Sequence, residues 1–176
     1  AAGLHIVDAL AQGMDSGEAS ESDLEASMVR LNRWDNSKGD GESPAMLKKE
    51  LQQCMQLNFG VFRKEAPMLE GIKKLEELRE RIGKASLNDD SRAFNTARLE
   101  ALELDNLLEI AEATAISAAG RRESRGAHAR DDFQTRDDEN WLCHSIFDPN
   151  TKTLSKRDVN FDPKTVPTFE PMERTY

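Results

Sequence analysis

The chain has 176 residues, of which 38% are hydrophobic and 32% charged, and its formal net charge is −9. This length suits one ordinary domain with an appended tail. The negative charge argues against nucleic-acid binding, because phosphate recognition needs a basic face, and no apolar run approaches the roughly 20 residues that span a bilayer. Cys54 and Cys143 lack Cys-x-x-Cys spacing, which argues against structural zinc and favours a reducing compartment.

Residues 1–43 are predicted to hold the end of one helix and a second, short helix. Helical periodicity is present from the first residue, without an initiator Met or a capping residue. We therefore expect the chain to begin partway through a helix of a larger protein; a processed mature N-terminus is the alternative. Ser22 and Glu25 have the spacing of a capping box and predict a helix that ends near Trp34. A turn-rich break follows over residues 36–44.

The middle of the chain, residues 44–120, predicts three long helices joined by short links. Apolar residues recur at i, i+3 and i+4 spacing over residues 44–63. Pro67 suits the first turn of a second helix that ends near Gly83. The third helix, residues 96–120, is rich in Leu and Ala along one stripe. The fold class is therefore mainly α, with an antiparallel three-helix bundle that is similar to a spectrin repeat.

Residues 121–176 predict a charged interface segment, a small β-hairpin and an extended tail. The turn signal Asp148-Pro149-Asn150 separates the first two of three short strand-like runs, which lie at 143–147, 153–157 and 159–161. The three prolines that follow forbid a helix and favour an extended C-terminal tail along another surface; they are Pro163, Pro167 and Pro171.

Residues 121–144, which we call the charged segment, combine five Arg, two His and six acidic residues. His and carboxylate side chains bind divalent metals, and His128 has the residue type of a general acid or base. However, the spacing of the ligand types matches no recognised metal loop, and no nucleophile or cofactor motif accompanies His128. The residues whose side chains could bind a metal are His128, Asp131, Asp132, Cys143 and His144. Because their spacing matches no known site, we predict no catalytic, cofactor-binding or metal-binding residue in this chain.

The arginines of the charged segment are better interpreted as contact groups. A guanidinium is a planar fork that binds carboxylates and carbonyls at packed interfaces, Gly126 permits a close backbone approach, and Trp is a frequent interface anchor. The alternative is that the arginines pair only with neighbouring acids at the surface and contribute little. We predict contacts with another domain or subunit through Arg125, His128, Arg130, Arg136 and Trp141.

These residues resemble a known family. The stretches Glu123-Ser124-Arg125-Gly126-Ala127-His128 and Arg136-Asp137-Asp138-Glu139-Asn140-Trp141-Leu142-Cys143-His144 are similar to the C-terminal region of the succinate dehydrogenase/fumarate reductase flavoprotein subunit. Further similar stretches are Phe94-Asn95-Thr96, residues 102–107 and Arg174-Thr175-Tyr176. The resemblance covers essentially the whole chain and is closest to the bacterial succinate dehydrogenases, because no insertion separates Arg136 from His144.

The resemblance implies an FAD-dependent parent protein that oxidises succinate to fumarate and passes electrons to an iron–sulfur subunit and on to quinone. In this family the flavin-binding domain and the substrate-binding residues precede the position of Ala1, so neither FAD nor substrate is expected on this chain. The family's C-terminal region packs on the flavin domain. The complex implied is peripheral, on the cytoplasmic face of the bacterial inner membrane, with no membrane span in this subunit.

Two alternatives remain open from the sequence. L-aspartate oxidase has the same overall plan and a similar Glu-Ser-Arg-Gly motif, but it works without an iron–sulfur partner. A free-standing helical adaptor that binds a partner through the charged segment is the second. The stretch from Trp141 to His144 and the closing Arg174-Thr175-Tyr176 favour the dehydrogenase.

Overall fold

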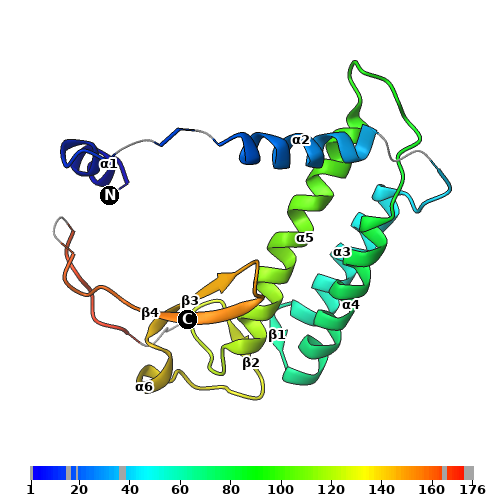
Figure 1. Cartoon of the computed structure of the whole chain (residues 1–176). Coiled ribbons are helices and arrows are strands. Elements are labelled where there is room, and N and C mark those ends of the chain that lie inside the picture. Colours follow the sequence, from blue (N-terminus) through cyan, green and yellow to red (C-terminus); the bar gives the residue numbers. More distant parts are fainter. Residues whose placement is uncertain (1, 15–16, 19, 36–38, 164–165, 173–176) are drawn as a thin grey trace. The chain divides into compact units, whose positions relative to one another are not determined.

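A computed structural model describes residues 2–14, 17–18, 20–35, 39–163 and 166–172. The contacts divide the chain into two units, one of residues 32–159 and one of residues 1–31 with 160–176. The helices are α1 (Ala2–Ala11), α2 (Glu21–Asp35), α3 (Pro44–Phe59), α4 (Glu65–Gly83), α5 (Thr96–Gly120) and α6 (Asp138–Trp141) (Figure 1). The strands are β1 (Phe62–Arg63), β2 (Ala129–Arg130), β3 (Cys143–Asp148) and β4 (Thr153–Asp158).

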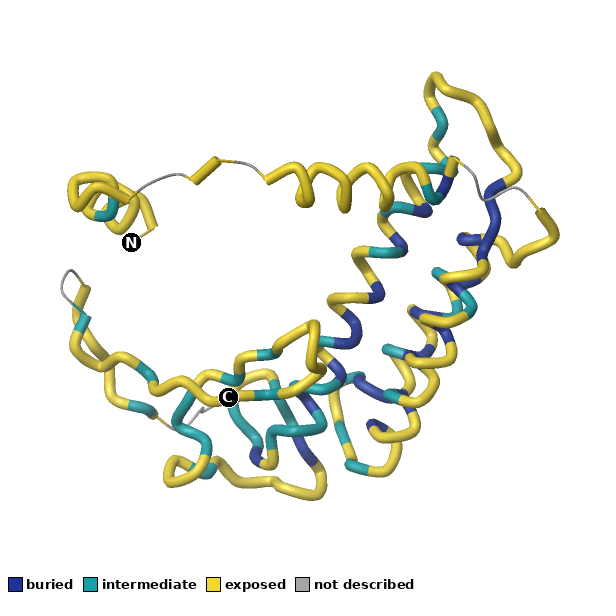
Figure 2. The backbone as a smooth tube through the Cα atoms, viewed as in Figure 1, coloured by how far each residue is buried: buried dark blue, intermediate teal, exposed yellow. Residues whose placement is uncertain are grey.

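The larger unit is built on a bundle of α3, α4 and α5, which confirms the predicted mainly α fold with a three-helix bundle. Each helix turns one apolar stripe inward, and the buried positions in Figure 2 follow these inner sides. Burial of such stripes is the main source of bundle stability. The largest fully buried apolar side chains are Trp34, Leu47, Met68, Leu75, Ile82 and Leu104.

Two glycine contacts show how closely the elements pack. A Cβ added to Gly71 on α4 would lie 2.5 Å from Cε2 of Phe59 on α3 and 2.6 Å from Cβ of Asn58, so only glycine fits at this crossing. A Cβ added to Gly120, at the end of α5, would lie 2.5 Å from Cδ1 of Leu154 on β4. The hairpin is therefore seated directly on the end of α5.

The predicted first bundle helix, residues 44–63, is too long by four residues. The helix α3 ends at Phe59, and Gly60 takes an extended conformation with φ −61° and ψ −153°. The next residues form β1, which pairs in parallel with β2, so that Phe62 lies opposite Ala129 and Arg63 opposite Arg130. This pairing partner is far away in sequence, and the helical periodicity of the first strand residues could not reveal it.

The end of α2 belongs to the larger unit, which begins at residue 32. The indole of Trp34 is 2% exposed and donates from Nε1 to Oδ2 of Asp105 over 2.8 Å. Arg33 donates to Oδ1 of the same carboxylate over 2.8 Å and also to the carbonyl of Ile82. One carboxylate on α5 thus fixes two consecutive side chains at the end of α2, within the larger unit.

The predicted hairpin is confirmed. Strands β3 and β4 pair antiparallel with Cys143 opposite Asp158 and Asp148 opposite Thr153. At the turn, Oδ1 of Asp148 accepts the N–H of Asn150 over 2.8 Å. The third predicted run, residues 159–161, is not a strand, because the ladder ends at Asp158 and these residues have no pairing partner in the described chain.

In the smaller unit, α1 has no buried residue, and the described tail residues 160–163 and 166–172 have no regular secondary structure. This agrees with the extended tail that the prolines predict. The family-like residues Arg174-Thr175-Tyr176 lie outside the described residues. Among the helices of the described chain, none has the combination of length and apolar character needed to cross a membrane.

Candidate interface at the end of the bundle

The charged segment is organised around the carboxylate of Glu123, which is completely buried. Arg121 donates to Oε1 over 2.5 Å, and Arg125 donates to Oε1 over 2.7 Å and to Oε2 over 3.0 Å. The backbone N–H of Asp137 donates to Oε2 over 2.8 Å. Burial alone would raise the pKa of Glu123, but these hydrogen bonds outweigh it and hold the pKa below its ordinary value.

A second ion pair joins the buried Arg130 to the more exposed Asp132. Arg130 is 1% exposed, and its guanidinium donates to both oxygens of Asp132 over 2.7 and 2.8 Å. The same guanidinium faces carbonyls of the last turn of α5, at Ala118 and Ala119, where a positive charge is favoured by the helix dipole. The hydrogen bonds from Arg130 lower the pKa of Asp132, which also accepts the backbone N–H of Glu65 at the start of α4.

His128 is held by partners on both ring nitrogens. Its Nδ1 lies 2.7 Å from a guanidinium nitrogen of Arg63, and its Nε2 lies 3.1 Å from the carbonyl of Arg121. A guanidinium can only donate, so Nδ1 accepts and Nε2 carries the proton that is donated to the carbonyl. Burial is the main cause that lowers the pKa of His128, and the nearby arginines lower it further. His128 is therefore a neutral connector whose two nitrogens are both occupied.

Gly126 lies in the turn between Arg125 and His128, and this turn requires a backbone conformation that favours glycine. The backbone N–H and carbonyl of Arg125 each bond to His128 over 2.9 Å, which leaves two residues in the turn. Gly126 takes φ +56°, a left-handed value that favours glycine, and an added Cβ would meet nothing within 4 Å. Within this chain the glycine serves the turn, whereas the sequence suggested a close approach of another backbone.

Trp141 lies between two cations at the end of α6. The ammonium of Lys156 on β4 is 3.8 Å from the ring centroid, and the guanidinium carbon of Arg121 is 5.4 Å from it. Asp137 caps α6 by accepting the N–H of Asn140 over 3.0 Å. These contacts fix the half-buried indole to the hairpin and leave its remaining surface on the outside of the segment.

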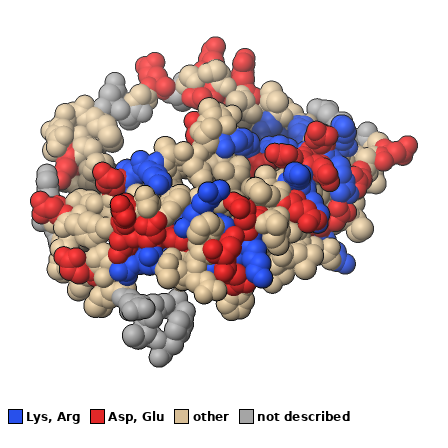
Figure 3. All heavy atoms as spheres, turned by 90° about the horizontal axis from the view of Figure 1, so that it is seen from below, with Lys and Arg blue, Asp and Glu red and all other residues tan. Residues whose placement is uncertain are grey.

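The five predicted contact residues are gathered at the end of the bundle where α5 finishes, but they differ in accessibility. The side chains of Arg125 and Arg136 are 26% and 32% exposed, and His128 and Trp141 are half-buried. Arg130 is instead enclosed by partners within the chain. We therefore expect it to hold the conformation of the segment rather than to contact a partner directly. Figure 3 shows acidic and basic side chains intermixed on the visible face, without a broad patch of one sign.

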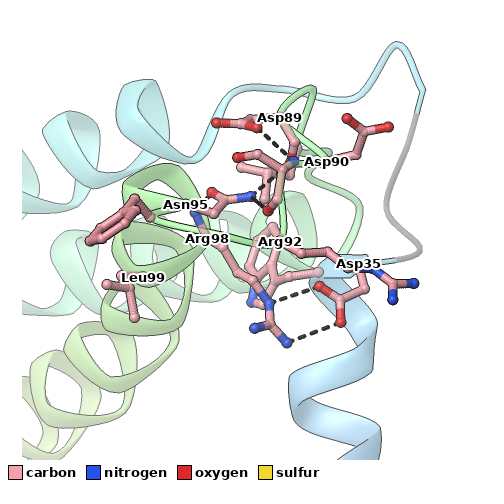
Figure 4. A pocket seen from close by; sticks show the side chains of 11 residues that line it. Asp35, Asp89, Asp90, Arg92, Asn95, Arg98 and Leu99 are labelled. Atoms are coloured by element: carbon pink, nitrogen blue, oxygen red, sulfur yellow. Dashed lines mark hydrogen bonds and ion pairs between the residues drawn. The ribbon is translucent and has the colours of Figure 1, made fainter.

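Most charged side chains of the segment pair with one another or with backbone groups. Within the described residues no group of three or more His, Cys, Asp or Glu side chains is placed to hold a metal ion. A separate hollow of about 670 Å³ lies at the other end of α5 (Figure 4), where Arg98 pairs with Asp35 over 2.7 Å. The charged segment thus presents a surface on which acidic and basic side chains are paired.

Sequence reasoning missed the residues on which this surface depends. From the sequence, Glu123 is assigned only to the family-like stretch and Arg121 only to the end of the third helix, and Arg63 lies outside the segment altogether. A signal was nevertheless present: residues 121, 123 and 125 are spaced by two, and in an extended segment this spacing places alternate side chains on the same side. The run Arg-x-Glu-x-Arg therefore indicates one carboxylate between two guanidiniums.

The comparisons with known proteins fit this geometry. A family model described as the fumarate reductase flavoprotein C-terminal region matches residues 48–176. The succinate dehydrogenase flavoprotein subunit of Coxiella burnetii is 44% identical over 99% of this chain and 29% of its own length. The fumarate reductase flavoprotein subunit of Haemophilus influenzae is 31% identical over 97% of this chain and 27% of its own length. The chain belongs to the succinate dehydrogenase/fumarate reductase flavoprotein C-terminal family.

The fold agrees with the family. A chain of the Escherichia coli quinol fumarate reductase superimposes with a TM-score of 0.72 and 35% sequence identity, covering 88% of this chain and 28% of that chain. This chain thus spans less than a third of the length of these relatives. An adenylylsulfate reductase from Archaeoglobus fulgidus, at 18% identity and a TM-score of 0.69, shares the fold alone.

Proposed function

We propose that this chain is the C-terminal, non-catalytic part of an FAD-dependent flavoprotein subunit that interconverts succinate and fumarate. The observation that carries the proposal is the family match over residues 48–176, together with relatives named as succinate dehydrogenase and fumarate reductase flavoprotein subunits. Electrons would pass to an iron–sulfur subunit and on to quinone, in a complex peripheral to the cytoplasmic face of the bacterial inner membrane. These names favour this activity over an aspartate oxidase or an unrelated adaptor.

Within that subunit, the role proposed for the chain is to pack on the flavin-binding part and support it. The charged segment suits such a contact because its internal pairs fix the backbone before any partner arrives, so little conformational entropy remains to be lost on docking. Arg125, Arg136, His128 and Trp141 are the partly exposed groups that would meet the partner surface. FAD and substrate would bind to residues outside this chain.

Arg136→Ala in the full-length subunit tests the contact, because this side chain is 32% exposed and pairs with the exposed Asp138. We expect lower flavin content and weaker assembly with the iron–sulfur subunit, with little change in bundle unfolding. Arg81→Ala is the matched control, since Arg81 is 38% exposed and pairs with Glu42 and Glu50 elsewhere on the bundle. Equal flavin contents in the two variants would refute the contact role.

A further inference from the structure

Helix α5 carries exposed apolar side chains on the side turned away from the bundle core. Leu99 and Ile110 are 62% and 67% exposed, and Leu107 is 40% exposed. Leu99 and Ile110 are eleven residues apart, which is about three helical turns, so they project from the same side. Ala101, Leu104, Leu108 and Ala111 are buried on the opposite side of the helix. We call this surface the outer face of α5.

The outer face of α5 is unusual in this chain because its second half has no charge. From residue 106 to residue 117, the positions on this side are Asn106, Leu107, Ile110, Ala113, Thr114 and Ser117. Of the acidic residues in the same stretch, Glu109 is exposed at the edge of this face and Glu112 is buried on another side, whereas 32% of the whole chain is charged. A helix whose outer side faces water normally carries charge there. An uncharged face of this length is typical of a surface that stays covered.

Phe94, two residues before α5, adds an exposed aromatic side chain at the end of the helix that carries Leu99. Its side chain is fully exposed, and its φ is +55°, a left-handed value that is costly for a bulky residue. Asn95 maintains this conformation: its Nδ2 donates to the carbonyls of Asp89 and Ser91 over 3.0 and 2.9 Å, and its Oδ1 accepts the N–H of Arg98 over 2.7 Å. Figure 4 shows Asn95 bonded to the loop that precedes α5, with Leu99 on the following turn.

A strained aromatic residue that is held out by a network of hydrogen bonds is characteristic of functional contacts. Backbone strain of about 1–3 kcal/mol persists only where the surroundings enforce it. Large aromatic side chains frequently act as anchors at the centre of interfaces. Phe94 and Leu99 also border the hollow of about 670 Å³ at this end of the bundle, so the partner would meet both a projecting ring and a recess beside it.

We propose that the flavin-binding part of the same polypeptide covers Phe94 and the outer face of α5; this rests on the proposed function. The relatives carry more than twice this chain's length in additional polypeptide, since the chain spans 29% of the C. burnetii subunit. A partner on the same polypeptide is always present at high effective concentration. It would therefore keep an uncharged surface covered. A second copy of the chain is disfavoured, because each copy has a net charge of −9 and the two would repel.

Site-specific photo-crosslinking in the full-length subunit tests this surface. The photoreactive amino acid p-benzoylphenylalanine is placed singly at Phe94 and Ile110, with Leu57 on α3 as the control because it is 80% exposed and apolar. We expect the first two positions to yield crosslinked peptides from the flavin-binding part of the same chain, and Leu57 to yield far fewer. Crosslinks mainly to the iron–sulfur subunit or to a second copy would overturn the proposal, as would equal yields at all three positions.

A charge substitution provides an independent readout. Ile110→Glu in the full-length subunit is expected to speed proteolytic release of the C-terminal part by about tenfold, with Leu57→Glu unchanged and the helical circular dichroism of both variants preserved. Equal release rates would contradict the proposal. Flavin content and succinate oxidation of the unmodified subunit distinguish the two claims: if both are present and the crosslinks are absent, only this surface is refuted, whereas their absence refutes the proposed function itself.

Discussion

Arg125 places its Nε 2.7 Å from Oε1 of Glu123, a carboxylate with no exposed surface. This pair connects the buried part of the charged segment to its exposed part. The guanidinium is 26% exposed and also reaches Oδ1 of Asp138 over 2.6 Å, so one side chain connects a buried anion to an exposed one. Arg125 therefore contributes both to the stability of the segment and to the surface that it presents.

Removing the buried charge is expected to destabilise the chain strongly. Glu123→Gln leaves Arg121 and Arg125 without their shared carboxylate, and breaking a buried pair by removing one partner costs about 3 kcal/mol. Urea denaturation at neutral pH measures this loss. Asp138→Asn is the control, because that carboxylate pairs with Arg125 at the surface and should have a much smaller effect. Equal losses in the two variants would show that Glu123 is not the centre of the network.

Two glycines of α4 are expected to respond to alanine in opposite directions. Gly71→Ala would force a Cβ to within 2.5 Å of Phe59, and such overpacking costs about 1–3 kcal/mol. Gly83→Ala adds a Cβ that meets nothing within 4 Å and should stabilise the helix by up to about 1 kcal/mol. Midpoints of thermal unfolding should move down for the first and up for the second. A rise at Gly71 would mean that α3 and α4 are not packed this closely.

The hairpin is expected to loosen when Lys152 is changed. Its ammonium and the guanidinium of Arg79 both bind the buried carboxylate of Glu112, and together they hold the pKa of Glu112 low although burial would raise it. Lys152→Met removes the tie between the hairpin turn and α5. Amide hydrogens of β3 and β4 should exchange roughly fivefold faster, as expected from a loss of about 1 kcal/mol. The exposed Lys49 on α3, changed to Met, should leave these rates unaltered.

His128 is expected to make stability fall on mild acidification. Its folded-state pKa is lowered from the ordinary value of 6.5, so below about pH 6.5 the unfolded chain binds the proton more readily than the folded chain. The contribution of His128 is therefore complete above pH 6.5 and is lost as the pH falls through the lowered value. The carboxylates with lowered pKa act only below their own ordinary values near 4.5.

The measurement for His128 is the free energy of unfolding at pH 7.5 and at pH 5.5. The wild-type chain should lose stability between these values, and His128→Gln should remove that part of the slope. His144→Gln is the matched control, because His144 is exposed on β3 and its replacement should leave the slope in place. An unchanged slope in His128→Gln would contradict the neutral tautomer deduced from its contacts with Arg63 and Arg121.

The three bundle helices could be predicted because their apolar residues repeat with the helical period, and Pro67 and Gly83 mark the ends of α4 closely. The exact end of α3 could not be predicted, because the residues after it form β1 only by pairing with β2. In that pair Arg63 lies opposite Arg130, which is 67 residues further along the chain. The burial of Glu123 and Arg130 could not be predicted either. Charged residues are almost never fully buried unless they are paired, and the sequence does not show which residues pair. Partners that are far apart or hidden in a charged run become visible only in the fold.

The exposed apolar residues illustrate a different limit. The Leu-rich pattern of residues 96–120 indicates a helix but does not assign Leu99 and Leu107, which look like core positions, to the outside. The sequence also predicted the charged segment as the main contact surface. The structure adds the uncharged outer face of α5 as a second candidate contact surface. The sequence cannot show which side of α5 is outside, because this depends on the helices that pack against it.

A titration of flavin tests the central claim most directly. The 176-residue chain and the full-length subunit are each titrated with FAD while the flavin absorbance and fluorescence are followed. We predict no stoichiometric spectral change for the chain alone, and bound flavin with succinate oxidation for the full-length subunit. Stoichiometric FAD binding by the chain alone, or a full-length subunit that neither holds flavin nor oxidises succinate, would contradict the account.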